Sequence, residues 1–301
     1  MAHERWFHRR GELARDGWES LVDERTPGWQ HTGIRVAALS AGDELPLAET
    51  GVERIVVPLA GSFTVVHVEN GETTRTELVG RPSVFDGPTD VLYLSAAATA
   101  TVSGEGRVAV ATSPTDDIRP TRRIPAADTP VELRGAGASS RQVHNFGTPQ
   151  ALDAARLIVC EVITPAENWS SYPPHKHDER VAGHESRLEE IYYFEAAPAR
   201  GSTRGTAYAA FGMFSAYSSP AGDIDIGAMV RTGDIALVPY GYHGPAVAAP
   251  GYDLYYLNVM AGPDPDRVWL ISDDPAHAWV RDTWADQEFD DRLPYTAEGA
   301  R

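Results

Sequence analysis

Residues 51–95 read GVERIVVPLAGSFTVVHVENGETTRTELVGRPSVFDGPTDVLYLS, and a glycine recurs in them about every ten residues. Between the glycines lie short runs rich in β-branched and aromatic residues, such as RIVVPLAG and DVLYLS. Short strands separated by turn residues at this spacing are typical of all-β sandwiches and barrels. Helical patterns are few, and the best of them is RGELARDGWESLV at residues 10–22. The sequence therefore predicts an all-β fold with few short helices.

The second half of the chain repeats this texture in ARLIVCEVI, EEIYYF, DIALVPYG and YDLYYLNVM. Each half has an acidic residue at the head of a β-rich run, Glu53 in ERIVVPLAG and Glu190 in EEIYYF, followed by a glycine-led segment that ends in a turn. Residues 113–130, SPTDDIRPTRRIPAADTP, are rich in proline and charge, as linkers are. We therefore expect a duplicated β-barrel, divided into residues 1–120 and 121–301.

Composition excludes several kinds of partner. The 301 residues include 43 acidic and 26 basic ones, and a net charge of −17 is unsuited to binding nucleic acid, which requires a basic face. No apolar run is long enough to span a bilayer, and the charged N-terminus lacks the apolar core of a signal peptide. We expect a cytoplasmic protein without a nucleic-acid or membrane partner. Cys160, inside LIVCEVI, is expected to be a buried strand residue.

Residues 173–194, PPHKHDERVAGHESRLEEIYYF, contain the first parts of a metal site. On a strand, His175 and His177 face the same way. Alternation along RLEEIYYF places Glu190 on a face with large apolar residues, where a carboxylate is costly unless it binds a cation. His243 directly follows the turn in GDIALVPYGYH. Three imidazoles and one carboxylate suit one divalent transition metal, such as Zn, Mn or Fe, and leave room for water or substrate oxygens.

Each of these pieces has a simpler interpretation when taken alone. The two histidines of HxH can lie in a polar loop, the glutamates at a solvated strand start, and His243 in an ordinary turn. Their order along the chain favours the metal site. Glu185 and Glu189 compete with Glu190 as the fourth ligand, but alternation favours Glu190 and turns Glu189 toward the surface or behind the ligands. Residues 178–187, DERVAGHESR, are expected to form a loop whose acidic residues are solvated or contact substrate.

The order of these features resembles the two motifs of the cupin superfamily, HxH with a downstream Glu and Gly-x5-Pro-x-Gly with a downstream His. Two spacings depart from that pattern: the gap before the glutamate is longer, and one residue is missing between Gly241 and His243. PPHKHD, ESRLEEIYYF, GDIALVPYGYH and VAAPGYDLYYLNVMAGP together resemble the 5-deoxy-glucuronate isomerase family of myo-inositol catabolism. The similarity extends over residues 28–280, although Phe214 and Ser215 stand where relatives often have Gln-Arg.

The resemblance implies a bicupin, two double-stranded β-helix barrels with one divalent metal in the C-terminal one. It also implies an aldose-ketose isomerase that converts 5-deoxy-D-glucuronate, a sugar acid, to 5-dehydro-2-deoxy-D-gluconate. The reaction has no net redox change and needs neither NAD nor a nucleotide. The N-terminal half has no HxH pair, since His67 lacks a second imidazole nearby, so we expect a degenerate barrel without metal. Cupins commonly dimerise, and we expect a homodimer or a larger assembly.

Some site residues follow from the isomerase interpretation alone. Tyr192 and Tyr256 are candidates for proton transfer, and Tyr192 and Tyr255 for hydrogen bonds to the sugar, although any of them can instead be core residues. Arg141 is our candidate for the substrate carboxylate, because arginine binds carboxylates bidentately; the alternative is a surface arginine. The metal's identity and the choice between enediol and hydride shift stay open. Rival functions are another uronate isomerase of this fold, a cupin Fe(II) dioxygenase and a non-catalytic sugar-acid-binding cupin.

Overall fold

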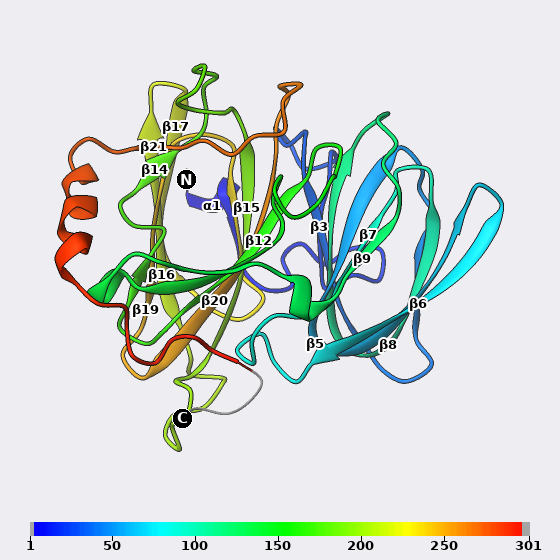
Figure 1. Ribbon diagram of the computed structural model, residues 1–301, viewed down its shortest axis with the longest axis horizontal. Coiled ribbons are helices and arrows are strands. Elements are labelled where there is room, and N and C mark those ends of the chain that lie inside the picture. The colour runs from blue at the N-terminus through cyan, green and yellow to red at the C-terminus, as the bar shows by residue number, and fades with distance from the viewer. Residues whose placement is uncertain (1–2, 297–301) are drawn as a thin grey trace.

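Two β-barrels lie side by side in the computed structural model, which describes residues 3–296 (Figure 1). The first barrel contains β2 (Ser20–Val22), β3 (Gly33–Leu39), β4 (Glu44–Leu47), β5 (Val52–Glu69), β6 (Glu72–Arg81), β7 (Val91–Leu94), β8 (Thr99–Pro114) and β9 (Arg122–Ile124). The second contains β1 (Phe7–His8), β10 (Val131–Arg134), β11 (Arg141–Gly147), β12 (Ile158–Thr164), β13 (Trp169–Ser170), β14 (His175–Lys176), β15 (Glu189–Pro198), β16 (Gly212–Ser219), β17 (Gly222–Val230), β18 (Ile235–Val238), β19 (Tyr242–Ala248), β20 (Tyr252–Ala261) and β21 (Ser272–Asp273). The predicted all-β fold is confirmed.

Helices are short, as expected, but not where the sequence suggested. They are α1 (His3–Trp6) and the 3-10 turns η1 (Ala126–Asp128), η2 (Gly137–Ser139) and η3 (Ala278–Asp286). The predicted helix at residues 10–22 is wrong, because this segment forms turns and then enters β2. Gly11 and Gly17 have φ angles of +87° and +85°, in a left-handed region that a right-handed helix cannot include.

The first barrel is one sheet in the order β2-β3-β8-β5-β7-β9, with β4 added to β8 and β6 to β5. The long strand β5 pairs with β7 near its start and with β6 after Gly61, so it passes around the barrel. Gly61 has a φ of +90°, and a Cβ there would lie 2.0 Å from the carbonyl oxygen of Glu105. The interior is filled by apolar side chains, among them Val56, Phe63 and Leu92.

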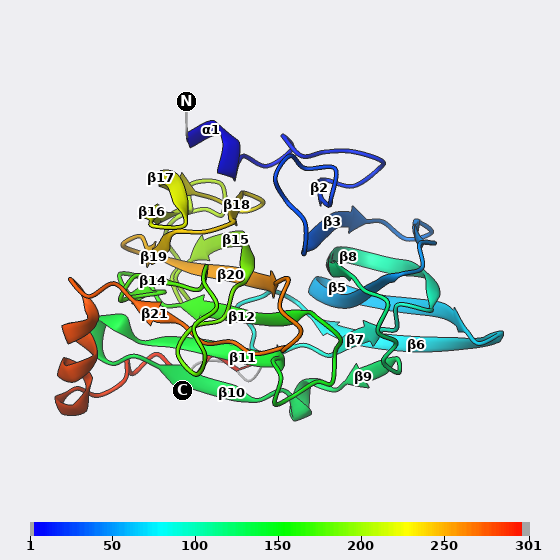
Figure 2. The same ribbon diagram turned by 90° about the horizontal axis from the view of Figure 1, so that it is seen from above.

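Two sheets make up the second barrel, one in the order β1-β18-β15-β20-β12-β11-β10 and the other β17-β16-β19-β14-β21 with β13 on β19. The predicted division at residue 120 needs two amendments. Strand β1, from the N-terminus, pairs with β18 of the second barrel, and α1 lies beside β17 and β18 (Figure 2). Strand β9, beyond residue 120, pairs with β7 of the first.

The two barrels are joined by a reciprocal pair of carboxylates. Glu189 of the second barrel accepts hydrogen bonds from the backbone N–H groups of residues 30–32, just before β3, at 3.3, 2.6 and 2.7 Å. Glu53 of the first accepts them from residues 155–157, just before β12, at 2.7, 2.6 and 2.7 Å. Each barrel therefore holds the backbone just before a strand of the other barrel, β3 in the first and β12 in the second.

The carboxylate contacts and the strand registers show which residues of the two barrels occupy equivalent positions. Arg54 pairs with Leu94 near the end of β7, as Glu190 pairs with Val238 at the end of β18. The residue that corresponds to Glu190 is thus Arg54, and Glu53 corresponds to Glu189. Glu53 and Glu190, the acidic residues that head the two runs in the sequence, are therefore not equivalent: their positions in the two barrels differ by one residue.

Candidate metal centre

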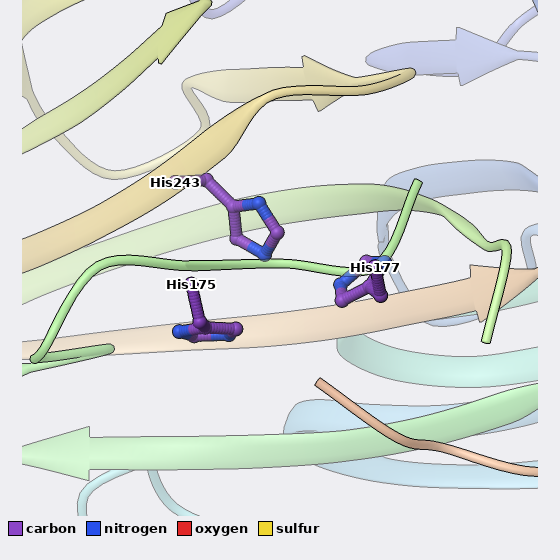
Figure 3. Close-up of side chains that lie close together, drawn as sticks. All are labelled: His175, His177 and His243. Atoms are coloured by element: carbon purple, nitrogen blue, oxygen red, sulfur yellow. The ribbon is translucent and has the colours of Figure 1, made fainter. Parts of the chain in front are cut away.

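Three histidines from adjacent strands surround a common space in the second barrel (Figure 3). His175 on β14 is the cross-strand partner of His243 on β19, and His177 follows two residues later, just past the end of β14. One ring nitrogen from each lies within 4.8 Å of the others, and all three residues are buried. Alternation along the HxH segment thus turns both of its imidazoles inward, as predicted.

The turn before His243 depends on Gly241. Its φ is +99°, and a Cβ there would lie 2.4 Å from Ile224 Cγ2 and 2.7 Å from the carbonyl oxygen of Tyr217. Only glycine fits such a conformation in such a space. This turn connects β18 to β19 and directs His243 toward the other two histidines.

Backbone carbonyls orient the three rings. Nδ1 of His177 donates to the carbonyl oxygen of Leu188 at 3.1 Å, Nδ1 of His243 to that of Gly241 at 3.1 Å, and Nδ1 of His175 to that of Pro173 at 3.3 Å. Because a carbonyl only accepts, each Nδ1 carries a proton, and Nε2 is the ring nitrogen left to bind a metal. This is the arrangement that metal-binding histidines use.

Glu190 completes the cluster from β15. Its Oε2 lies 3.0 Å from Nε2 of His177 and 3.0 Å from Nε2 of His243. Burial by itself disfavours the charged carboxylate, but its contacts with His177 and His243 lower the pKa of Glu190 to about 2. Burial and the charges of its histidine neighbours hold the pKa of His175 well below its usual range, so this ring is neutral.

The four side chains fit a divalent transition metal. Nε2 of His243 is buried and forms no well-aligned hydrogen bond within the described part of the chain, although Oε2 of Glu190 lies 3.0 Å from it. A buried nitrogen without an aligned hydrogen bond is costly, and a metal ion between it and the carboxylate would satisfy it. Three Nε2 atoms and one charged carboxylate oxygen are the donor set that zinc, manganese or iron takes in proteins, with positions left for substrate.

The competing glutamates have other partners. Glu189 faces away from the histidines and accepts hydrogen bonds from residues 30–32, as described above. It therefore lies neither at the surface nor behind the ligands, the two places expected from the sequence. Glu185 is buried and accepts a 2.8 Å hydrogen bond from Nζ of Lys176, which also donates to Asp178 at 2.7 Å. The expectation that the acidic residues of 178–187 are solvated or touch substrate is therefore wrong for Asp178 and Glu185, since Lys176 neutralises them.

A cavity of about 510 Å³ opens beside the cluster, and His175 and Glu190 are part of its wall. Arg141 of β11 also lines it, with 8% of its surface exposed. Its guanidinium donates to the carbonyl oxygens of Ser139 at 3.0 Å and Tyr172 at 3.5 Å, and lies 5.6 Å from the ring centre of Trp284 in η3. No carboxylate forms an ion pair with Arg141 among residues 3–296. Figure 1 shows η3 as the coiled red ribbon at the edge of the second barrel.

Two of the three predicted tyrosines line the cavity. The hydroxyls of Tyr192 and Tyr256 lie 3.3 and 2.9 Å from Ser171 Oγ, so three hydroxyl groups form a chain. Tyr255 faces the opposite side of β20, where its hydroxyl donates to Glu161 Oε2 at 2.7 Å. Glu161 lies outside the cavity and pairs with Arg81 of the first barrel. The structure thus removes Tyr255 from the set of cavity residues.

Several cavity residues were not identified from the sequence: Arg134, Ser171, Asn258, Arg281 and Trp284. Asn258 could have been identified as a cavity residue from the sequence, because strand alternation places it on the same face as Tyr256. The others come from irregular segments or short elements in which no periodicity indicates direction.

Across the described residues, no helix is both long and apolar enough to cross a membrane.

Comparisons with known proteins agree on one family. Residues 6–280 match the sequence profile of the KduI/IolB family. A relative from Geobacillus kaustophilus named 5-deoxy-glucuronate isomerase is 39% identical over 266 residues, which span 87% of this chain and 90% of the relative.

Solved structures agree on the architecture. An IolB-like protein from Salmonella typhimurium has a TM-score of 0.80 and 33% identity, with 91% of this chain and 98% of that one covered. Oxalate decarboxylase of Lactobacillus farciminis, in its formate complex, has a TM-score of 0.61 at 10% identity, covering 89% of this chain and 88% of its own. The second likeness concerns the fold alone, and with it the predicted bicupin fold is confirmed.

Proposed function

This chain belongs to the KduI/IolB family, and we propose that it is a metal-dependent aldose-ketose isomerase that converts 5-deoxy-D-glucuronate to 5-dehydro-2-deoxy-D-gluconate. A single cavity is lined by His175 and Glu190 of the metal cluster and by Arg141, which has no acidic partner among residues 3–296, and this combination supports the assignment most directly. The substrate has an aldehyde at one end and a carboxylate at the other. The cavity thus offers a group for each end, and its volume is in the range of small-molecule sites.

The metal would be held by Nε2 of His175, His177 and His243 and by Glu190. When bound, it supplies a Lewis acid that polarises the substrate carbonyl. Arg141 binds the substrate carboxylate at the other end. Burial lowers the pKa of Arg141 to about 10, so its guanidinium keeps its charge at neutral pH. This charge and its fork of donors fix which end of the sugar acid faces the metal.

The cavity hydroxyls act as donors in this mechanism. Burial raises the pKa of Tyr256, and burial with the nearby charge of Glu190 raises that of Tyr192 well above its usual value. Both phenols therefore keep their protons at neutral pH and can donate to substrate oxygens. Ser171 connects the two hydroxyls, so a proton released at one oxygen can be exchanged along the chain toward the next.

The test is an NMR assay of the purified protein with 5-deoxy-D-glucuronate before and after chelation. We expect conversion to 5-dehydro-2-deoxy-D-gluconate, loss of conversion on chelation, and recovery when Zn²⁺, Mn²⁺ or Fe²⁺ is added back. Oxygen uptake would indicate a dioxygenase, preference for another uronate a different isomerase, and ligand stabilisation without turnover a binding protein. A homodimeric or larger assembly and a cytoplasmic location remain predictions from the sequence.

A further inference from the structure

Asn258 is a buried polar residue of the cavity that the mechanism above does not use. On β20 it is the cross-strand partner of Tyr192 on β15 and of Cys160 on β12. Tyr192 is two residues from Glu190 and shares its face of β15, so Asn258 lies at the metal end of the cavity. It lines the cavity wall, and only 3% of its surface is exposed.

The orientation of the Asn258 amide follows from its contact with Cys160. The thiol Sγ lies 4.0 Å from Oδ1 of Asn258. Cys160 is buried on its strand, as predicted, and burial raises the pKa of its thiol to about 12. The thiol therefore keeps its proton and donates a hydrogen bond to Oδ1. The Nδ2 group of Asn258 then lies on the side away from Cys160.

Nδ2 of Asn258 is the only buried side-chain amide nitrogen without a hydrogen-bond partner in residues 3–296. Other buried amide nitrogens in the second barrel are satisfied: Gln142 donates to the carbonyl oxygen of Tyr295 at 2.9 Å, Asn168 to that of Ser140 at 3.0 Å, and Asn145 to Oε2 of Glu132 at 3.0 Å. An unsatisfied buried donor destabilises the folded protein. A group of this kind beside a cavity is a candidate for binding a ligand.

We propose that Asn258 donates a hydrogen bond from Nδ2 to a substrate oxygen at the carbons between which the carbonyl moves. This role rests on the isomerase function proposed above. The donor is neutral, so it does not compete with Arg141 for the substrate carboxylate. It favours an oxygen that gains negative charge as a proton leaves the neighbouring carbon, as donors do in oxyanion holes. Asn258 would thus be a catalytic residue that contacts substrate and not a ligand of the metal.

The experiment compares Asn258→Asp and Asn258→Ser with the wild-type holoenzyme. Aspartate has the same shape and keeps an oxygen for Cys160, but it replaces the donor by an acceptor. Serine is uncharged and guards against misfolding caused by a new buried charge. We expect kcat/KM for 5-deoxy-D-glucuronate to fall about a hundredfold or more, mostly through kcat. Metal content and thermal midpoint should stay at the wild-type level in the serine variant. Asn70→Asp, in the turn after β5, is the matched control.

Two results would overturn the assignment: kcat/KM within twofold of wild type in both variants, or loss of metal from the serine variant. If wild type does not turn over 5-deoxy-D-glucuronate, the proposed function fails, and thermal stabilisation by D-glucuronate becomes the readout. Stabilisation of wild type that is lost in the serine variant then still supports a substrate-oxygen contact. No stabilisation of wild type, or equal stabilisation of both proteins, rejects it.

Discussion

Glu189 and Glu190 are neighbours in the sequence, but their side chains point to opposite faces of β15. Glu190 contacts two histidine nitrogens at 3.0 Å, whereas Glu189 holds the backbone of residues 30–32. Glu190→Gln keeps the shape of the side chain but removes the negative charge that would neutralise a cation. We expect this variant to lose bound metal and turnover. Glu189→Gln should keep metal content near the wild-type level.

Metal stoichiometry after dialysis against a weak chelator separates the two variants. Metal retained by Glu190→Gln and lost by Glu189→Gln would contradict the assignment of the fourth ligand. Urea unfolding of both variants provides the control for damage to the fold.

Within the described part of the chain, Arg141 differs from the other arginines of the cavity in having no acidic partner. Arg134 pairs with Glu132 at 2.8 Å, and Arg281 pairs with Asp273 through two contacts. Arg141→Gln should raise KM for the sugar acid by about ten- to a hundredfold, since hydrogen bonds to charged groups contribute about 1.5–3 kcal/mol. Steady-state kinetics check this, with the exposed Arg75→Gln as control. An unchanged KM would exclude Arg141 from carboxylate binding.

At the scale of the elements, each barrel is anchored by a carboxylate from the other. Glu53 accepts three backbone N–H groups and also the hydroxyl of Tyr93 at 2.7 Å. In Glu53→Gln, one acceptor oxygen becomes an NH₂ group that faces donors, so buried donors lose their partners. We expect the free energy of unfolding to fall by about 2–3 kcal/mol.

Urea unfolding measures that change, and Glu77→Gln is the control. Glu77 pairs with exposed Arg75, and exposed ion pairs contribute about 0–1 kcal/mol. Equal midpoints for Glu53→Gln and Glu77→Gln would show that the anchor at β12 adds little to stability.

At the scale of the whole molecule, a buried ion pair crosses between the barrels. Arg81 of β6 binds both oxygens of Glu161 on β12 at 2.6 Å, and Nδ1 of His144 lies 2.6 Å from the same carboxylate. Burial disfavours the charge, but Arg81 and His144 lower the pKa of Glu161 to about 2. Because the pKa of Glu161 is lower in the folded state than its value of about 4.5 in the unfolded chain, the ionised carboxylate stabilises the fold at pH values above about 4.5. This stability is lost as the pH falls toward 2.

Unfolding midpoints measured from pH 7 to pH 2 should therefore drop more steeply in wild type than in the double variant Arg81→Gln with Glu161→Gln. Both partners are replaced because a lone buried charge would be costly in itself. Parallel pH curves for the two proteins would show that the pair contributes nothing to acid sensitivity.

The two barrels also differ in their capacity for metal. In the first barrel, Arg54 takes the position of Glu190, and its guanidinium donates to the carbonyl oxygen of Ala98 at 3.0 Å. Of the groups of possible ligands in the described chain, none lies in the first barrel. A fixed positive charge repels a second cation there. Elemental analysis should therefore find one metal per chain, and two per chain would refute a purely structural first barrel.

The sequence by itself determined the features that depend on local periodicity. Turn glycines and β-rich runs predicted the all-β fold, and alternation predicted that His175 and His177 share a face and that Glu190, not Glu189, turns inward. These inferences hold because side-chain direction along a strand repeats every two residues whatever the strand's neighbours are. Cupin-like motifs in the same stretches were enough to indicate the fold family.

Only the tertiary structure decided which distant groups meet. The sequence analysis named both Tyr255 and Tyr256 as candidates, and the barrel's packing decided that Tyr256 faces the cavity and Tyr255 the other barrel. The sequence did not reveal that Glu189 binds residues 30–32, that Lys176 neutralises Glu185, or that β1 joins the second barrel. These contacts join residues far apart in the chain, and no local pattern encodes them. The sequence can indicate that a buried charge requires a partner, but only the folded structure determines which residue is that partner.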